Sequence, residues 1–296
     1  MSLARMLWNK GGSSKDDTDP PKPQYPAPPA DGRCIINELP PELFNYIFDF
    51  AVQIQLEDPD YLDSDSDSDS GDSEPRPVPV AVLVSHVCKL WRSVALNQPT
   101  LWNHIALDIT ATPEGIQRAK TRLATYLERA REAPLDIAID LGDFPEDSDS
   151  EEDDTSDDEK EARPEYKYLS EMIDMVVPRH KQLRSFEVIV SDFLLMAATL
   201  KVLEEIPEAP QLESLSLYNH DEFDDMEFFE PTRFTNLHVL PFHGKAPRLK
   251  SVALWGVHLD WEQTSLTLLK DLEELELAYH PEDVRPTYKQ IGRAHV

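Results

Sequence analysis

Apolar and polar positions first fall into a regular pattern near Ile35, and the pattern is helical. From Leu39 to Ile54 apolar residues recur three and four places apart, and prolines stand at the start, where a helix tolerates a missing N–H. The apolar positions form two stripes, which are Leu43, Ile47, Phe50, Ala51 and Ile54 in one and Phe44, Phe48 and Val52 in the other. One stripe is enough to pack a helix against one neighbour. Two stripes therefore predict burial on two sides, one of them against a partner.

A second helix is predicted from Val80 to Leu96. Its apolar residues keep helical spacing between polar ones, and they are Val80, Leu83, Val84, Val87, Trp91 and Val94. The valines would also suit a strand, but the length of 17 residues and the polar set Ser85, Lys89 and Arg92 favour a helix. Residues 97–102, Asn-Gln-Pro-Thr-Leu-Trp, then turn the chain.

The second half of the chain repeats one short apolar pattern four times. The copies are Leu183-x-x-Phe186-x-Val188, Leu212-x-x-Leu215-x-Leu217, Leu249-x-x-Val252-x-Leu254 and Leu272-x-x-Leu275-x-Leu277, offset by 29, 37 and 23 residues. Their alternation predicts short strands, and the stretches between them, such as 192–206 and 259–269, predict helices. A similar motif at Leu237, Leu240 and Phe242 lies only 12 residues before the next copy, so we expect a connecting segment there.

An earlier strand-and-helix unit is expected before these copies. Thr112-Pro113-Glu114 has the residue types that start a helix, and apolar residues follow at helical spacing. Pro134 then precedes an alternating segment, 135–139, which predicts a strand.

Negative charge is concentrated in two segments. The formal net charge is -29, and residues 57–74 hold 9 acidic side chains and no basic one, while residues 143–161 hold 12 acidic side chains and one lysine. Such segments bury too little apolar surface to fold, so we expect disorder in both and in the Pro-rich residues 1–34. The remainder is only mildly acidic. Phosphate backbones and anionic lipids select basic surfaces, so we expect no nucleic acid and no membrane among the partners.

Other features of composition place the chain inside the cell. No apolar run reaches the length of a membrane span, the first residues do not form a secretory signal, and Cys34 and Cys88 are too few for a disulfide framework. We therefore expect a cytoplasmic or nuclear protein with reduced cysteines.

The two predicted helices and the turn after them contain one ordered set of residues, which is Leu39-Pro40-Pro41-Glu42-Leu43, Ile47-Phe48, Val87-Cys88-Lys89-Leu90-Trp91-Arg92, Ala95 and Pro99-Thr100-Leu101-Trp102. This set resembles the F-box, especially in its fungal form. The match spans residues 38–107, and it departs from the family in the Asp/Ser insert at 56–79, where members have a much shorter connection. The resemblance implies that the helices dock onto a Skp-type adaptor, which links them to a cullin scaffold. It implies that the rest of the chain captures an unknown protein substrate and that the chain is not an enzyme.

By position in the motif, the residues expected to contact the adaptor are Leu39, Pro40, Leu43, Ile47, Phe48, Val84, Val87, Cys88 and Trp91. For Val87 and Trp91, a place in the helical core is the alternative. Leu39 and Pro40 stand at the exposed start of the first helix, which favours an interface role for both.

The four-copy pattern resembles leucine-rich repeats, so the expected fold class is α+β overall. A small all-α helical module at 35–107 is followed by an irregular α/β solenoid at 108–290, with disordered acidic insertions. The last residues, 291–296, read like a translated sequencing-adapter tail and are expected to lie outside the fold.

No pattern points to catalysis or to a bound cofactor. The Asp63–Glu74 run lacks the glycine that a calcium loop needs at its sixth position, and the histidines are scattered. We expect no catalytic residues, no metal and no cofactor. An acidic residue follows three places after several hydroxyl side chains, and these candidates for acid-directed phosphorylation are Ser64, Ser66, Ser148, Ser150, Thr155 and Ser156. Two other functions stay open, a repeat scaffold that never enters a ligase and an acidic factor that binds basic proteins.

Overall fold

The structure is a computed structural model, and it describes residues 34–57, 78–109, 112–141, 164–191, 193–220 and 238–293. The two acidic segments and the candidate phosphorylation sites lie outside the described residues, except Glu57. Residues 34–40 belong to one compact unit and residues from Pro41 onward to another. In the first unit, Ile35–Glu38 form a 3-10 turn, η1, in which the Leu39 amide donates to the Ile36 carbonyl at 3.2 Å.

The second unit begins with three α-helices, α1 (Pro41–Glu57), α3 (Val80–Val87) and α4 (Lys89–Asn97), followed by the 3-10 turn η2 (Pro99–Leu101). We call residues 41–101 of this set the helical region. The first predicted helix is confirmed. The prediction of one helix from Val80 to Leu96 is wrong, because Cys88 is extended, with φ −156° and ψ 175°.

The break at Cys88 has a local cause. The Cys88 sulfur accepts a hydrogen bond from the Trp91 amide at 3.5 Å and so caps the first turn of α4. On the other side of the break, Arg92 Nε donates to the Ser85 carbonyl at 2.8 Å, which satisfies an acceptor at the end of α3. The apolar spacing continues through the break, so periodicity alone could not reveal it.

A six-stranded parallel sheet follows, with its strands in chain order. The strands are β1 (His104–Asp108), β2 (Leu135–Asp140), β3 (Leu183–Val190), β4 (Ser214–Asn219), β5 (Ser251–Trp255) and β6 (Glu274–Ala278). The five predicted strands are present as β2 to β6. The structure differs from the prediction at residues 104–107, which were assigned to the helical module and instead pair with β2 as most of β1.

The repeated pattern is aligned across the sheet. Phe186 pairs with Leu215, Leu215 with Val252, and Val252 with Leu275, so the equivalent positions of the four copies lie in one row. The third pattern positions form a second row, which is Val188, Leu217, Leu254 and Leu277. In β3 to β5 the side chains of both rows are buried. A mixed helix and strand fold with a parallel sheet is therefore confirmed.

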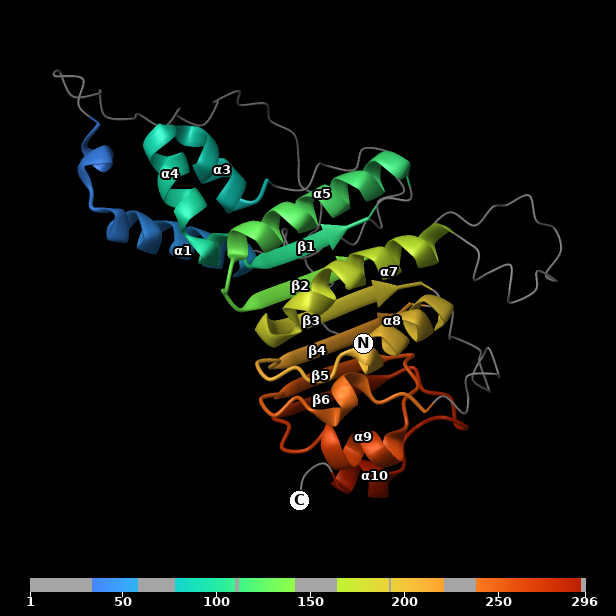
Figure 1. The fold of residues 1–296 in the computed structure, drawn as a ribbon. Helices are drawn as coiled ribbons and strands as arrows, with labels where there is room; N and C mark the ends of the chain where they lie inside the picture. The colour runs from blue at the N-terminus through green and yellow to red at the C-terminus, as the bar shows by residue number, and fades with distance from the viewer. Residues whose placement is uncertain are drawn as a thin grey trace, which may run out of the picture. The chain divides into compact units, whose positions relative to one another are not determined.

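Helices cover one face of this sheet (Figure 1). The elements between and after the strands are α5 (Pro113–Ala130), α7 (Pro164–Val176), η3 (Val177–Gln182), α8 (Phe193–Glu205), η5 (Pro241–Gly244), α9 (Trp261–Thr267) and α10 (Tyr288–Arg293). The helices expected after Thr112, at 192–206 and at 259–269 are confirmed as α5, α8 and α9. Thr112 caps α5 by accepting from the Gly115 amide at 3.0 Å.

The α7 helix was not predicted. The segment around Leu240 carries the turn η5 and no strand, as expected of a connecting segment. Residues 291–293, which were expected to lie outside the fold, are the last three residues of α10, while 294–296 are outside the described residues.

Candidate docking surface of the helical region

The two stripes of α1 have opposite environments. Phe44, Phe48 and Val52 are buried, at 1%, 1% and 8% exposed. The other stripe points to solvent, with Leu43 49%, Ile47 39%, Phe50 60% and Ile54 54% exposed, while Ala51 is half-buried. We call Leu43, Ile47, Phe50 and Ile54 the exposed row. One predicted side of burial is thus present within the chain, and the second side has no cover among the described residues.

The buried stripe of α1 packs against α4 through three aromatic rings. The ring centroid of Trp91 lies 5.6 Å from that of Phe44 and 5.2 Å from that of Phe48, and the two phenylalanines are 5.8 Å apart. These separations suit tilted and edge-on aromatic contacts. Trp91 is therefore half-buried in the core of the helical region, the alternative that the sequence left open for it.

Polar contacts hold α1 in this orientation at its middle and near its carboxyl end. Gln98 Nε2 donates to Asp49 Oδ1 at 2.7 Å, and Thr100 Oγ1 donates to the same oxygen at 3.0 Å. Near the carboxyl end of α1, Gln55 accepts from the Val80 amide at 2.8 Å and donates to the Val78 carbonyl at 3.2 Å. The carboxyl end of α1 and the start of α3 therefore lie next to each other, although the acidic insert separates them in the sequence.

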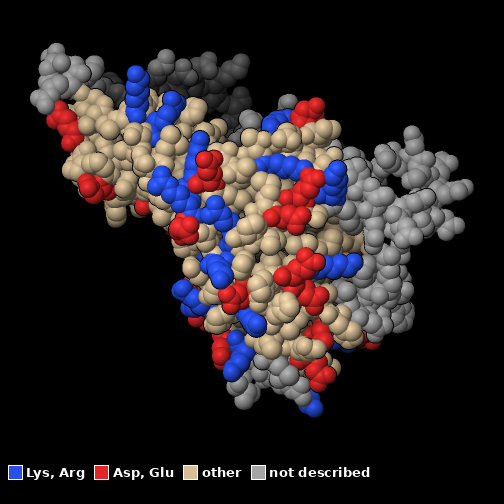
Figure 2. Space-filling view, in the orientation of Figure 1, with Lys and Arg blue, Asp and Glu red and all other residues tan. Residues whose placement is uncertain are grey.

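Helices α3 and α4 also carry exposed apolar side chains. Leu83, Val87 and Leu90 are 52%, 60% and 39% exposed. Charged residues are scarce on the three helices, and they are Glu42, Asp49, Glu57, Lys89 and Arg92. In Figure 2 the corresponding part of the surface is mostly tan, whereas acidic and basic side chains lie interspersed over the helices of the sheet. A surface this apolar is expected to bind another macromolecule.

Seven of the nine residues expected at an adaptor interface lie in the helical region, and they fall into three groups by exposure. Leu43, Ile47 and Val87 are exposed and available to a partner. Cys88 and Trp91 are half-buried, and both shape the helical region from inside. Phe48 and Val84 are buried, at 1% and 8% exposed, and their side chains pack in the core of the helical region, so their expected contact with an adaptor stays a prediction.

Leu39 and Pro40 belong to the separate unit and are described by themselves. Leu39 is half-buried and Pro40 is exposed. The sequence reasoning left out several exposed apolar residues of the helical region, and these are Tyr46, Phe50, Ile54, Leu83 and Leu90. The signal for Phe50 and Ile54 was present, because both belong to the second stripe of α1.

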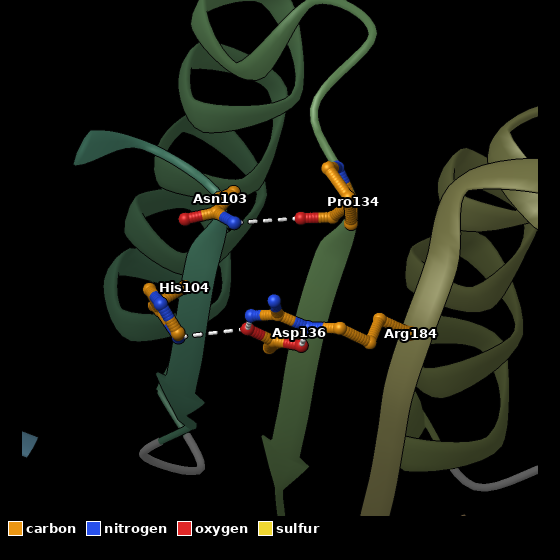
Figure 3. Close-up of polar contacts among 5 residues, drawn as sticks. All are labelled: Asn103, His104, Pro134, Asp136 and Arg184. Atoms are coloured by element: carbon orange, nitrogen blue, oxygen red, sulfur yellow. Dashed lines mark hydrogen bonds and ion pairs between the residues drawn. The ribbon is translucent and has the colours of Figure 1, made fainter. Parts of the chain in front are cut away.

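The charged cluster around Asp136 lies at the start of the sheet (Figure 3). His104 Nδ1 of β1 lies 2.9 Å from Asp136 Oδ2 of β2, and Arg184 of β3 forms a second ion pair with the same carboxylate. Arg184 can reach across because the register between β2 and β3 shifts at this point, where Leu135 pairs with Leu183 but Asp136 pairs with Ser185. Although burial would raise the pKa of Asp136, the hydrogen bonds from His104 and Arg184 hold it below its ordinary value.

Buried Asn103, just before β1, joins the start of β1 to the start of β2. Asn103 Nδ2 donates to the Pro134 carbonyl at 2.7 Å (Figure 3), and the Asp136 amide donates to the Asn103 carbonyl at 2.9 Å. The cluster compensates its own charge within the chain. We therefore assign it a structural role, which is to join β1, β2 and β3 at the amino-terminal end of the sheet.

Comparisons of the chain with protein-family models, with curated proteins and with solved structures find no match. In the part of the chain that the structure describes, no three His, Cys, Asp or Glu side chains gather in a way that could hold a metal ion. The described helices also include none with the length and apolar character to cross a membrane.

Proposed function

We propose that the chain is the substrate-recognition subunit of a Skp-cullin-F-box ubiquitin ligase. In this role the helical region binds a Skp-type adaptor, and the sheet region holds a protein substrate for ubiquitination. The chain itself performs no chemistry.

The observation that supports the proposal is the exposed row of α1. Four large apolar side chains face solvent on one side of a helix whose other side is already packed. Burying a fully exposed side chain of this size is worth about 1.5–3 kcal/mol, and these four are 39–60% exposed, so a partner that covers the row gains roughly half of that for each. Leu43 and Ile47 of the row also belong to the F-box-like motif, and Val87 and Leu90 add apolar surface from α3 and α4.

The sheet region supports the second half of the role. Each of the six strands is parallel to its neighbours in chain order, and the helices lie on one face. The arrangement is that expected of an irregular leucine-rich-repeat solenoid, in which each strand-and-helix unit contacts only its neighbours. Such arrays leave one sheet face open for a protein ligand, which fits a receptor for substrates.

The acidic insert between α1 and α3 is longer than the connection in the F-box family, but the Gln55 contacts keep the two helices joined. Because α1 and α3 remain joined through Gln55, Val78 and Val80, the insert does not prevent the helices from packing as one unit. The exposed row is formed with the insert present in the chain.

The proposal is tested by purifying the tagged full-length chain from cells and probing for the adaptor and the cullin. Both should be recovered with the intact chain, and replacing Leu39 and Pro40 by Ala should reduce their recovery without changing the thermal stability of the chain, because neither side chain is in the described core. Recovery of neither protein with the intact, folded chain would favour a scaffold that does not enter a ligase.

A further inference from the structure

The sheet has one face that none of the described helices covers. Alternate residues of each strand point to this face, since the others are buried beneath the helices. In β3 to β6 the middle row of this open face is Glu187, Ser216, Ala253 and Glu276, and the next row is Ile189, Tyr218, Trp255 and Ala278. None of these outward positions is Lys or Arg.

Four aromatic rings gather at the carboxyl ends of β4, β5 and β6. Trp255 is central, and its ring centroid lies 5.1 Å from Tyr218, 5.7 Å from Tyr279 and 6.1 Å from His220. Tyr218 and Trp255 are half-buried, while Tyr279 is 52% exposed. Large rings that support one another at the surface lose little conformational entropy when a ligand packs on them. We call these four residues the aromatic cluster.

Carboxylates surround the aromatic cluster. Glu276 Oε1 accepts a hydrogen bond from the Trp255 indole at 3.1 Å, and Glu274 Oε2 accepts one from the Ser251 hydroxyl at 3.2 Å. Burial raises the pKa of Tyr218 above its ordinary value, and the charges of Glu187, Glu276 and Glu274 raise it further. The Tyr218 phenol therefore lies within the field of three carboxylates from β3 and β6.

The surroundings of Glu187 disfavour its ionised form. Burial raises its pKa, and the nearby charge of Asp140 raises it further. By contrast, Asp136 on the same face is neutralised by His104 and Arg184. The described residues supply no such cation to Glu187. Glu187 is half-buried, and a carboxylate that loses part of its hydration without gaining a cation costs folding free energy, which a ligand that brings a cation reduces.

We propose that this open face binds a basic segment of a partner protein, with Arg or Lys side chains of that segment held against the aromatic cluster and paired with the carboxylates of Glu187 and Glu276, which flank the cluster on β3 and β6. A guanidinium or ammonium group is attracted to the faces of Trp and Tyr rings and pairs with carboxylates. The same field repels phosphate, which excludes a nucleic acid as the ligand of this face.

The size of the surface favours a protein segment over a small cation. The rings belong to three neighbouring strands, whose spacing of about 4.8 Å makes the cluster roughly 10 Å wide. Several residues of an extended segment are needed to cover it. The inference rests on the proposed function in that it names the class of substrate, proteins with an exposed basic segment, although the binding itself does not require the adaptor.

The test measures binding of a short fluorescein-labelled peptide of Gly, Ser and Arg to the full chain by anisotropy, at about 0.15 M salt, where the Debye length is about 8 Å. A peptide with Gln in place of Arg is the neutral probe. The acidic segments of the chain attract any basic peptide, so the comparison is made between variants that all keep them. Trp255→Ala should weaken binding of the Arg peptide about tenfold, and Trp255→Phe should weaken it less, because the ring face remains.

Glu187→Gln separates ligand binding from folding. Because the fold raises the pKa of Glu187, the ionised carboxylate destabilises the folded state near neutral pH, so the amide should raise the urea midpoint. The same variant should weaken peptide binding several-fold. Glu205→Gln, which removes one exposed carboxylate from α8, is the matched control and should change neither measurement.

Equal affinity for the Arg and Gln peptides, or unchanged affinity in both Trp255→Ala and Glu187→Gln, would overturn the inference. Outcomes for the two proposals stay distinct. Peptide binding that depends on Trp255 in a chain that ignores the adaptor supports this inference and contradicts the ligase role. Adaptor binding by a chain whose peptide binding does not depend on Trp255 or Glu187 supports the ligase role and overturns this inference.

Discussion

The Trp102 indole Nε1 donates a hydrogen bond to the Ala95 carbonyl at 2.8 Å, and neither residue is exposed. The same ring packs edge-on against Tyr126 of α5, with centroids 5.1 Å apart, and lies 4.2 Å from the Arg129 guanidinium. Trp102 stands between η2 and β1. One side chain therefore joins the helical region to the first strand-and-helix unit of the sheet.

Changes at Trp102 should destabilise both regions together. Trp102→Phe keeps most of the ring packing and removes the indole hydrogen bond, which should cost about 1 kcal/mol. Trp102→Ala also leaves a cavity and should cost about 3–5 kcal/mol. Urea unfolding followed by far-UV circular dichroism measures both values, with the partly exposed Trp255→Phe as the control. A Trp102→Ala chain as stable as the wild type would mean that the two regions are not joined here.

Asp136 should make stability depend on acid pH. Its pKa is lowered in the folded state by His104 and Arg184, so its contribution is present above the unfolded value of about 3.9 and is lost as the pH falls through the folded value. Asp136→Asn should cost about 2 kcal/mol near neutral pH, and the difference from the wild type should shrink below about pH 4. Urea midpoints measured across this range check the prediction, and a difference that stays constant with pH would contradict it.

Cys88 should be replaceable by Ser and not by Ala. A serine hydroxyl is a preferred helix N-cap, so Cys88→Ser should keep or increase stability, whereas Cys88→Ala removes the acceptor of the Trp91 amide and should cost about 0.5–2 kcal/mol. Thermal unfolding of both variants measures the difference. Cys34→Ser, at an exposed position, is the control. Identical stabilities for the Ser and Ala variants would show that the sulfur is not a cap.

The two stripes of α1 should respond differently to truncation. Phe48→Ala removes a buried ring that contacts Phe44 and Trp91 and should cost about 3–5 kcal/mol. Phe50→Ala removes a ring that is 60% exposed and should change the free energy of unfolding by less than about 1 kcal/mol. Urea unfolding compares the pair on one helix. Equal losses would mean that Phe50 is covered within the chain.

Much of the sheet could be predicted because each copy of the repeated pattern carries its own alternation of apolar residues. Leu215 and Leu217, for example, lie two residues apart and point to the same side, which a strand permits and a helix does not. The signal for β1 was weaker, since its five residues adjoin a motif that implied helices through residue 107. The α7 helix holds Leu169, Met172, Ile173 and Val176 at helical spacing, so its signal was present but not used.

The environment of the candidate surface was harder to predict. Both stripes of α1 are apolar, and only the contacts of Trp91 with Phe44 and Phe48 decide which stripe is buried. Those contacts depend on the orientation of α4, which in turn depends on the break at Cys88. The motif placed Phe48 at an interface because motif position cannot separate a core residue from a surface neighbour one place away.

The central claim is tested most directly by titrating the purified full-length chain with a purified Skp-type adaptor in a calorimeter. We predict binding at micromolar concentration or tighter, weakened at least about tenfold by Phe50→Asp, since a charge in the exposed row opposes its burial. Ala124→Asp, which adds the same charge to an exposed position of α5, should bind like the wild type. Absence of heat at micromolar concentration, both with the intact folded chain and with a chain that lacks residues 58–77, would contradict the claim.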